Sequence, residues 1–435
     1  MGLLEAFTRA LHATPADADV VQEARLAALA RARDLGIPDT RHEDWKYTDL
    51  TALARQEFQP APTVAPDEST LPLASLAAYR AVFVNGGHSA RLSTAEALPA
   101  GATMRTLREI ATQDPAWIAG QLGAQGTAVA KVFPALNAAG ACDGLSLEIG
   151  PDVHLDRPLL VMFVGASAAA PTLSAPHLRV RAGARSSVSI VEVHVNQGEE
   201  ASLANAYTRI ETADGANVRH YRVVCDAAAA THVGQVQLLV GAHSQVENFS
   251  LVLGGRLTRV DIDCDLAAAG GSVLLNGVFL AGPGSHVDHH TRVDHRASHT
   301  TSDEVYRGIA DGNGRGVFNG KIVVAPGVEK VVATQASHNL LLSSDAEIDT
   351  KPELEIYADD LRCSHGATVG QLDEDALFYL RARGVPEAEA RALLLFGFVQ
   401  NSLEAIPYPE LQSLVAARFA ADNAALGQIL AGAAA

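Results

Sequence analysis

The sequence predicts a mainly β protein whose long central body is a β-helix or a two-sheet sandwich, flanked by helical regions. Three observations predict this class. One turn pattern recurs, in which a glycine and a few small or polar residues precede the valine that opens the next strand. The stretches between these turns read as strands, as in SVSIVEVHV and QVQLLV, and no good helix of about 12 residues fits between them. Helical periodicity is confined to the two ends of the chain.

The recurring turn is found at Gly183–Val188, Gly215–Val218, Gly241–Val246, Gly282–Val287, Gly312–Val317 and Gly327–Val331. Successive glycines lie 15 to 41 residues apart. Self-similarity at such periods is typical of a solenoid, in which each coil buries its apolar face only by stacking on the next. Because the turn glycines are irregularly spaced, a two-sheet sandwich remains an alternative fold. We expect an N-terminal helical and mixed region over residues 1–150, a β core over 151–370 and a C-terminal helical region over 371–435.

The N-terminal region should begin with an amphipathic helix, because apolar residues recur at helical spacing at Leu4, Phe7 and Leu11. A second helix is predicted from about Asp17 to Leu35. The motif EDWKYTDL, residues 43–50, follows, and we interpret its aromatic side chains as an anchor for these helices, without a chemical role. Residues 57–75 are rich in proline and threonine and predict a linker.

The charge and composition exclude several classes of function. A net charge of −17 argues against a nucleic-acid or anionic-membrane partner. The hydrophobic content of 48% and charged content of 19% are typical of a globular protein. No apolar run of about 18 residues occurs, and the first residues carry acids rather than a basic leader. We therefore expect a soluble, cytoplasmic protein.

The four cysteines are scattered singly along the chain, at Cys142, Cys225, Cys264 and Cys363. There is no CxxC pair, no zinc-finger spacing and no ferredoxin-type run. A disulfide framework is not expected in a long chain without a secretion signal. The cysteine pattern is therefore not that of a self-contained iron–sulfur protein.

A cysteine and a histidine stand two residues apart where the β body gives way to helices. On a strand, Cys363 and His365 face the same side and could jointly present sulfur and imidazole nitrogen. Thiolate with imidazole suits iron or zinc. Two ligands do not complete a site, however, so the spacing alone leaves a buried cysteine beside a turn histidine as the alternative.

A second candidate metal site is the stretch HVDHHTRVDHRASH, residues 286–299, which has five histidines and two aspartates. Strand alternation would place His286, Asp288 and His290 on one side and His289 on the other. The first three could form a site with two histidines and one carboxylate. The alternative is a polar strand face near a subunit boundary.

The chain after Gly370 should be helical. Asp373 is a plausible N-cap for a helix that ends at Gly384, and Pro386 should lie near the first position of the next helix. The second helix is apolar nearly all round, so it should pack against a large surface. Surplus apolar surface on these helices would be core or a docking face for a partner. The candidate partner-binding residues are Asp373, Leu377, Phe378, Leu380, Phe396 and Phe398.

Several longer stretches resemble one known family. They are LEIYADDLRCSHGATVGQLDEDALFYLRARG, GRGVFNGKIVVAPGVEK and TQASHNLLLSSDAEIDTKPELEIYADD, together with EDWKYTDL near the other end. The sequence is similar to the SufB/SufD scaffold family of the SUF iron–sulfur cluster assembly system, and most to its SufD branch. The match is nearly continuous over residues 304–400 and diffuse between the short N-terminal motif and this region.

The resemblance implies a right-handed parallel β-helix core that pairs with a SufB paralogue. It also implies that the C-terminal helical domain binds the ABC ATPase SufC, and that a nascent iron–sulfur cluster forms transiently at the SufB–SufD interface. His365 matches the family's proposed cluster-site histidine, and Cys363 beside it is the weaker candidate. No cluster is expected to stay on the isolated chain. A reduced flavin in the complex and a homodimer of the chain alone are left open.

Two other functions are left open by the sequence. The chain could be the SufB paralogue itself, although its first cysteine is Cys142 and SufB commonly carries an N-terminal cysteine motif. It could also be a β-helix enzyme that acts on polysaccharide, although the aromatic content of 5% is low for a sugar-binding cleft. There is no P-loop, no GxSxG and no HExxH motif, so we expect a non-catalytic protein.

Overall fold

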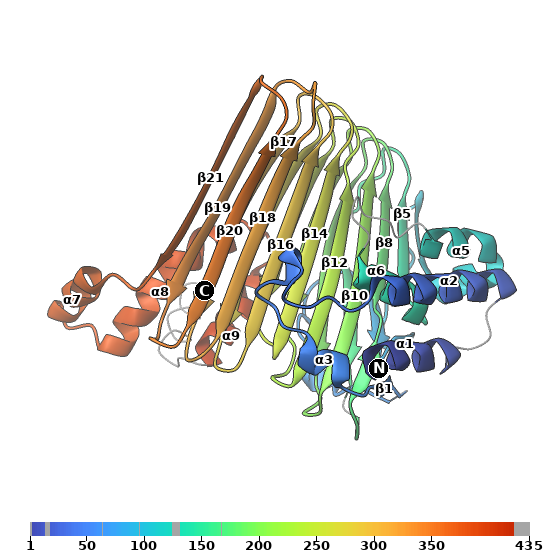
Figure 1. The fold of residues 1–435 in the computed structure, drawn as a ribbon, viewed down its shortest axis with the longest axis horizontal. Coiled ribbons are helices and arrows are strands. Elements are labelled where there is room, and N and C mark those ends of the chain that lie inside the picture. Colours follow the sequence, from blue (N-terminus) through green and yellow to red (C-terminus); the bar gives the residue numbers. More distant parts are fainter. Residues whose placement is uncertain are drawn as a thin grey trace.

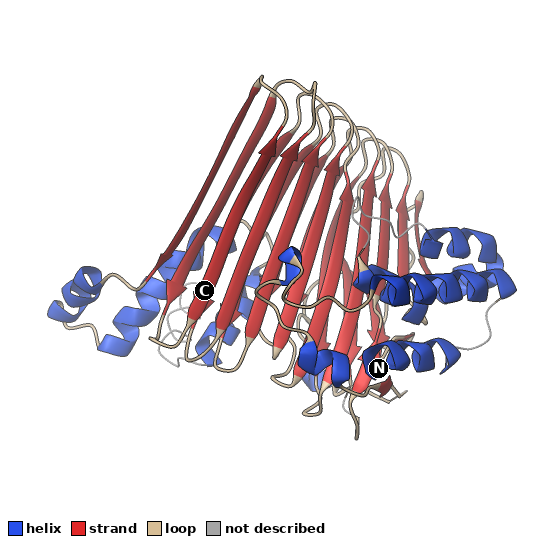
Figure 2. Ribbon diagram, in the orientation of Figure 1, coloured by secondary structure: helices blue, strands red, loops and turns tan. Residues whose placement is uncertain are grey.

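The protein folds as a parallel β-solenoid of about eight turns with helices at both ends (Figures 1 and 2). The computed structural model describes residues 2–13, 18–62, 64–94, 96–123, 131–166 and 168–421. Strands make up 41% and helices 25%. The predicted β-helix is therefore confirmed, and the two-sheet sandwich is wrong, because almost every strand pair is parallel rather than antiparallel.

The chain passes alternately through two sheets, and each pair of strands completes one coil. Sheet A has the order β20-β18-β16-β14-β12-β10-β8-β5-β4, with β1 and β7 beside it. Its strands are β1 Gln59–Pro60, β4 Ala102–Thr106, β5 Leu145–Ile149, β7 Thr172–Ser174, β8 His177–Ala182, β10 Ser202–Thr212, β12 Ala230–Leu239, β14 Leu257–Leu266, β16 His286–His295, β18 Arg315–Val324 and β20 Glu347–Ile356.

Sheet B has the order β21-β19-β17-β15-β13-β11-β9-β6-β2-β3. Its strands are β2 Tyr79–Val84, β3 Gly87–His88, β6 Leu159–Gly165, β9 Ser187–Asn196, β11 Asn217–Val224, β13 Gln245–Val252, β15 Ser272–Ala281, β17 Thr301–Ala310, β19 Val331–Leu341 and β21 Leu361–Gly370. The sheets thus begin before residue 151, since β2, β4 and β5 already belong to them.

In-register stacking explains why the turn pattern ends in valine. Val188, Val218, Val246 and Val273 are successive register partners across β9, β11, β13 and β15, and all are buried. β-branched side chains pack well against their neighbours on a pleated surface, so each coil supplies the same residue type at the same height. The apolar core between the sheets is built from columns of this kind.

A column of left-handed residues at one edge of the solenoid explains the irregular glycine spacing. The residues with positive φ there are Asp152, Arg185, Gly215, His243, Gly270, His299 and Lys330. Each of the first six donates its N–H to the carbonyl just before the next member of the column, as in Arg185 to Asp214 at 2.9 Å and Gly215 to Ala242 at 2.8 Å, and Lys330 donates to Asp360 of the last coil at 2.7 Å. Only two of the seven are glycines, and the predicted turns at Gly282 and Gly312 lie on the opposite edge, before β16 and β18.

The helices cover different sheets. They are α1 Gly2–Ala13, α2 Asp19–Leu35, α3 Thr51–Arg55, α4 Leu107–Gln113, α5 Pro115–Gly123, α6 Val132–Gly140, α7 Glu374–Ala382, α8 Glu387–Glu404 and α9 Pro409–Ala421, with short 3₁₀ turns at Glu43–Trp45 and Glu68–Thr70. The first two match the predicted helices, apart from residues 14–17, which lie outside the described residues. Among the helices of the described residues, none is long and apolar enough to cross a membrane.

The N-terminal helices pack on sheet A, and α6 lies against its outer face. Every residue of α6 is buried, and one apolar cluster joins α1, α2 and α6 to Leu203 of β10 and Val233 of β12. Asn137 fastens α6 to the sheet, because its side-chain amide donates to the carbonyls of Pro176 and Asn205 at 2.8 and 2.7 Å. A buried amide with both hydrogens used fixes the position of the helix.

The helices α8 and α9 pack on sheet B. Leu395, Val399 and Leu403 belong to the same apolar cluster as Tyr221 and Phe249 of the sheet. This confirms that the apolar helix predicted after Pro386 packs against a large surface, although Pro386 is its N-cap rather than its first helical residue. The helix α7 is the outermost element at this end of the molecule (Figure 1).

Candidate functional site

The last coil of the solenoid, formed by β20 and β21, is an open edge. Each of these strands ends its sheet and pairs on one side only, β20 with β18 and β21 with β19. Eight of the ten residues of β21 are exposed. An unpaired strand edge presents a row of free N–H and C=O groups that another chain can pair with.

Cys363 and His365 both lie on β21, on the face that continues the solenoid interior. Their register partners on β19 are Ala333 and Gln335, which are buried at 0% and 3% exposure. Paired residues in a parallel sheet point to the same side, so both side chains share the inward face, as the sequence predicts. Because no further coil of the described residues covers this face, His365 is exposed.

The two candidates differ in their surroundings. Cys363 is half-buried and packs against the small apolar cluster that includes Ile322, Val324 and Ala333. Burial raises the pKa of its thiol, with a backbone hydrogen bond from Ala333 acting in the opposite direction. A protonated thiol is a poor metal ligand. The exposed imidazole of His365 is therefore the better placed of the two to meet a ligand or a partner chain.

The histidine-rich stretch forms β16, and its alternation is as predicted, with His286, Asp288 and His290 on the outer face of sheet A. Asp288 is fully buried and already has several protein partners. Its Oδ2 accepts hydrogen bonds from Arg259 at 2.9 Å and from Thr48 at 2.5 Å, and His290 Nε2 lies 3.0 Å from its Oδ1. Among the described residues, no group of three or more His, Cys, Asp or Glu side chains is arranged to hold a metal ion. The geometry of this stretch supports a structural role.

Although burial acts to raise it, the neighbouring His290 and Arg259 hold the pKa of Asp288 below its ordinary value. The carboxylate therefore stays charged beneath the segment that covers it. A buried charge of this kind is tolerable because it is paired and hydrogen-bonded.

The segment that covers Asp288 is the EDWKYTDL motif, whose role the sequence left open. The Trp45 ring stacks on the guanidinium of Arg259 at 3.7 Å and lies 5.4 Å from the Phe133 ring of α6. Thr48 also contacts His286 at 2.9 Å, and Glu43 pairs with Lys351 of β20. The motif is thus a strap across β14, β16 and β20, which supports the interpretation as an anchor.

A cavity of about 860 Å³ lies beside this strap, over the outer face of sheet A. Its charged lining residues neutralise one another, as in Lys131 with Asp263 at 2.9 Å, Arg292 with Asp294 at 2.8 Å and Arg259 with Asp261 at 2.9 Å. It contains neither Cys363 nor His365. We therefore place the candidate site at the terminal coil and not in this cavity.

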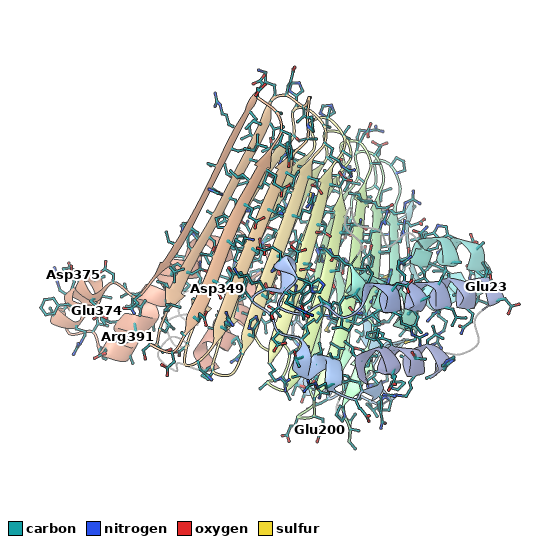
Figure 3. The ribbon with its side chains drawn as sticks, viewed as in Figure 1. Glu23, Glu200, Asp349, Glu374, Asp375 and Arg391 are labelled. Atoms are coloured by element: carbon teal, nitrogen blue, oxygen red, sulfur yellow. The ribbon has the colours of Figure 1, made fainter. Side chains whose placement is uncertain are left out.

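The residues predicted to bind a partner are divided between core and surface. Asp373 caps α7, accepting from the backbone N–H groups of Asp375 and Ala376 at 2.9 and 3.0 Å, and Leu377 is buried at 2% exposure. Phe378 is 72% exposed, whereas Leu380 is half-buried. Phe396 and Phe398 of α8 are half-buried against the sheet B cluster. Figure 3 shows Glu374 and Asp375 at the same outer end of the molecule.

Exposed apolar side chains gather at this end of the solenoid. Of the eleven large apolar side chains that are exposed among the described residues, seven lie in the last coils or on the helices that follow. They are Val332, Ile356, Tyr357, Val369, Phe378, Tyr379 and Leu393. Such a concentration is typical of a surface that another protein covers.

The sequence reasoning missed the polar residues inside the solenoid. Glu192 is fully buried between the sheets, and its carboxylate is bonded to Arg222 at 2.7 Å, His220 at 2.8 Å and His194 at 2.6 Å. Glu304 of β17 is a second fully buried carboxyl. The available signal was a charged residue at an inward position of an alternating strand, which requires the register of the strand to be known.

Comparison with known proteins gives matches over nearly the whole chain. Residues 163–398 match the family described as SUF system FeS cluster assembly, SufBD core domain, and residues 3–161 match the SufBD protein N-terminal region. An iron–sulfur cluster assembly SufBD family protein of Synechocystis is 30% identical, over 94% of this chain and 96% of the relative.

Two relatives carry the name SufD. The iron–sulfur cluster assembly protein SufD of Escherichia coli is 29% identical over 88% of each chain. That of Bacillus subtilis is 27% identical over 63% of this chain and 62% of the relative. These matches leave no support for the polysaccharide-active alternative and favour SufD over the SufB paralogue. The chain therefore belongs to the SufBD family of iron–sulfur cluster assembly proteins and is of the SufD type.

Proposed function

We propose that the chain is a non-catalytic, cytoplasmic scaffold subunit of a SUF complex, which pairs with a SufB paralogue through its terminal coil and binds the ABC ATPase SufC through its C-terminal helices. The observation that carries this proposal is the open edge of β20 and β21, which bears His365 on its inward face. A second chain that extends both sheets would bury this edge and place its own residues opposite His365.

In this arrangement the iron–sulfur cluster is cargo that forms at the junction of two chains. The four cysteines of this chain are dispersed, and His365 is the ligand or proton donor that it contributes. The remaining ligands come from the paralogue, so the isolated chain keeps no stable cluster after anaerobic reconstitution. The net charge of −17 is consistent with protein partners rather than nucleic acid or anionic membranes.

The docking site proposed for the ATPase is the exposed face of α7. Phe378 and Tyr379 are 72% and 57% exposed, and large exposed aromatic side chains are frequent at the centre of protein interfaces. Leu377 and Asp373 support this face from behind, since Leu377 is buried and Asp373 caps the helix. ATP hydrolysis by the bound ATPase would then act on the junction between the two scaffold subunits.

The test of the cluster role is His365→Ala, assayed by complementation of cells that lack the native subunit. We expect a loss of cluster assembly with normal recovery of the complex, because an exposed side chain contributes little to folding. The matched control is His338→Ala, a histidine of the neighbouring strand on the opposite face, which should complement fully. Full complementation by His365→Ala would remove the proposed role, and a large fall in its melting temperature would show that the residue is structural.

A further inference from the structure

The interior beneath the terminal coil holds buried polar atoms without a hydrogen-bond partner in the described part of the chain. They include Glu304 Oε1, Gln335 Oε1 and Thr350 Oγ1, together with Tyr306 Oη and Asn339 Oδ1. Buried side-chain polar atoms are nearly always hydrogen-bonded, so each unpartnered atom needs an explanation. The most informative of them is Gln335 Oε1, because it lies one coil below His365.

Glu304, Gln335 and His365 form one column along the solenoid axis. They are successive register partners on β17, β19 and β21. Neighbouring strands lie about 4.8 Å apart, and register partners point to the same side, so the Gln335 and His365 side chains leave the sheet at adjacent positions on the same face. Gln335 is 3% exposed and Glu304 is fully buried. His365, at the end of the column, is the only member of these three that reaches the open edge.

Glu304 determines which way the Gln335 amide points. Gln335 Nε2 donates to Glu304 Oε2 at 3.3 Å, and Thr291 Oγ1 donates to the same oxygen at 2.7 Å. Burial raises the pKa of Glu304 to about 7, but in either protonation state one carboxyl oxygen remains free to accept these two bonds. With its nitrogen held by Glu304, the amide has its oxygen left as an acceptor for the next group in the column.

The room for this amide is provided by Gly320 of β18. A Cβ atom at position 320 would collide with the Gln335 amide nitrogen. Gly320, Gln335 and His365 come from the three stretches GRGVFNGKIVV, TQASHN and RCSHGAT that the sequence singled out, and the fold brings all three to one place. The local packing therefore accommodates an amide with a fixed orientation beneath the histidine.

We propose that Gln335 is a positioning residue for His365, whose ring N–H donates a hydrogen bond to Gln335 Oε1. A neutral imidazole has one N–H and one nitrogen with a free lone pair. When the N–H is used on the inward side, the other nitrogen faces the open edge with its lone pair, ready to bind iron or accept a proton there. Histidine ligands of metals are commonly oriented by such a bond from their other ring nitrogen.

This inference deepens the proposed function of His365, but the orientation itself is measurable in the full chain without partners. In protein labelled with ¹⁵N-histidine, the ring nitrogen shifts of His365, assigned with His365→Ala, report which tautomer is present. We expect one tautomer in the unchanged chain and a mixture typical of free imidazole in Gln335→Met. Cluster assembly in complementing cells should fall by about tenfold, the lower end for lost supporting bonds around metal ligands.

The controls separate positioning from packing. Ser337→Ala changes the next inward residue of β19, whose register partner is Ala367, and should alter neither the tautomer nor assembly. Glu304→Gln keeps an acceptor for the Gln335 amide and should behave like the unchanged chain. Gly320→Ala displaces the amide without replacing Gln335 and should reproduce the tautomer mixture. This variant replaces Gln335→Met in the experiment if Gln335→Met folds poorly.

An unchanged His365 tautomer in folded Gln335→Met and Gly320→Ala would overturn the inference. A tautomer mixture combined with undiminished assembly would support the positioning by Gln335 but would remove the role of His365 in cluster assembly. The two proposals can therefore fail separately.

Discussion

At its N-terminal end the solenoid stops on short antiparallel strands, whereas at its C-terminal end it stops on two full-length strands. Sheet B begins with β3, a two-residue strand antiparallel to β2, and sheet A begins with β4, five residues antiparallel to β5. The chain then leaves β4 directly into α4, whose start is fixed by a capping box of Thr106 and Glu109. The terminal strands β20 and β21 are ten residues each, and nothing in the described residues pairs with their outer edges.

The difference between the two ends indicates which one meets another chain. Proteins limit strand pairing at exposed sheet edges by ending the sheet on very short strands or by covering the edge, because a long free edge pairs readily with other chains. The N-terminal end follows this rule and the C-terminal end does not. Most of the exposed large apolar side chains also lie at the C-terminal end. Long terminal strands with free edges and exposed apolar side chains are normally covered by a partner.

The largest effect is expected from a proline placed in an inner strand, compared with a proline at the same register in the edge strand. Ser337 of β19 and Ala367 of β21 are register partners. Val332 N–H donates to the carbonyl of Thr300, the residue just before β17, so Val332 N–H points toward β17. Strand alternation then directs the Ser337 N–H toward β21 and leaves the Ala367 N–H on the free edge. Ser337→Pro should destabilise the fold by about 3 kcal/mol or more, whereas Ala367→Pro should cost little.

Melting temperatures of the two proline variants measure the destabilisation, and copurification with the SufB paralogue measures whether each variant still pairs. Ala367→Pro should fold and yet lose the paralogue, because it removes a donor from the edge. Normal pairing by a folded Ala367→Pro variant would argue against pairing through β21. Equal destabilisation by both prolines would mean that β21 is not a free edge.

The pH dependence of stability should also differ along the solenoid. Glu192 lies on β9, in one of the first coils, and is buried, but Arg222, His194 and His220 lower its pKa well below the ordinary value. Its contribution to the free energy of unfolding is therefore lost only in acid. For Glu304, burial raises the pKa to about 7 from 4.5. The unfolded chain then loses this proton first, so the free energy of unfolding falls as pH rises from about 4.5 to about 7, by at most about 3 kcal/mol.

Glu304→Gln should remove this part of the pH dependence. Thr291 and Gln335 hydrogen-bond to Glu304, and the adjacent Asp303 adds a charge that raises the pKa further. The buried thiol of Cys264 and phenol of Tyr306 also interact with Glu304, and both are neutral in this pH range because burial raises their pKa values. Melting temperatures at pH 5 and pH 8 should differ less in Glu304→Gln than in the unchanged chain. The exposed Glu347→Gln is the control and should keep the full difference. An undiminished difference in Glu304→Gln would show that another group carries it.

The class of fold was predictable from the sequence because stacking forces each coil to repeat its turn and its opening valine. The exact spacing of the turns was not predictable, because the repeating unit is a backbone conformation rather than a residue type. Arg185, His243 and His299 adopt the left-handed conformation that Gly215 and Gly270 adopt elsewhere in the column. A hydrogen bond to the next coil offsets a strain of about 1–2 kcal/mol at each non-glycine position.

The candidate site was predictable only in part, for a related reason. Alternation along one strand places Cys363 and His365 on the same face, and this required no knowledge of the fold. The neighbours Gln335 and Glu304 are 30 and 61 positions before His365 in the sequence and become adjacent only through the register of three strands. Register likewise places Arg259 beside Asp288, and the EDWKYTDL segment adds Thr48, which the strand of Asp288 alone could not indicate.

A smaller effect, on ATPase binding, is expected from Phe378→Asp on the C-terminal helices, compared with Leu26→Asp on the N-terminal helices. Phe378 is 72% exposed on α7, and Leu26 is 46% exposed on α2 at the other end. Both changes place a charge on an exposed apolar position, so neither should alter the melting temperature by more than a few degrees. Only Phe378→Asp should weaken ATPase binding, by about tenfold or more, since central aromatic side chains carry much of the binding energy at interfaces.

Binding constants for the purified ATPase decide this prediction. Equal affinity of Phe378→Asp and the unchanged chain would move the docking site away from α7. A similar loss in Leu26→Asp would indicate a general effect of added negative charge instead.

The smallest effect is expected at Cys363, the weaker of the two site candidates. Its side chain is half-buried against Ile322 and Ala333, and burial raises the pKa of its thiol. A thiol that stays protonated at neutral pH contributes packing more than ligation, and serine preserves most of its volume. Cys363→Ser should therefore cost about 1 kcal/mol or less and leave cluster assembly above half of normal, whereas His365→Ala should nearly abolish it. If Cys363→Ser stops assembly while its melting temperature is unchanged, the thiol is a ligand and the inward face of β21 supplies two donors rather than one.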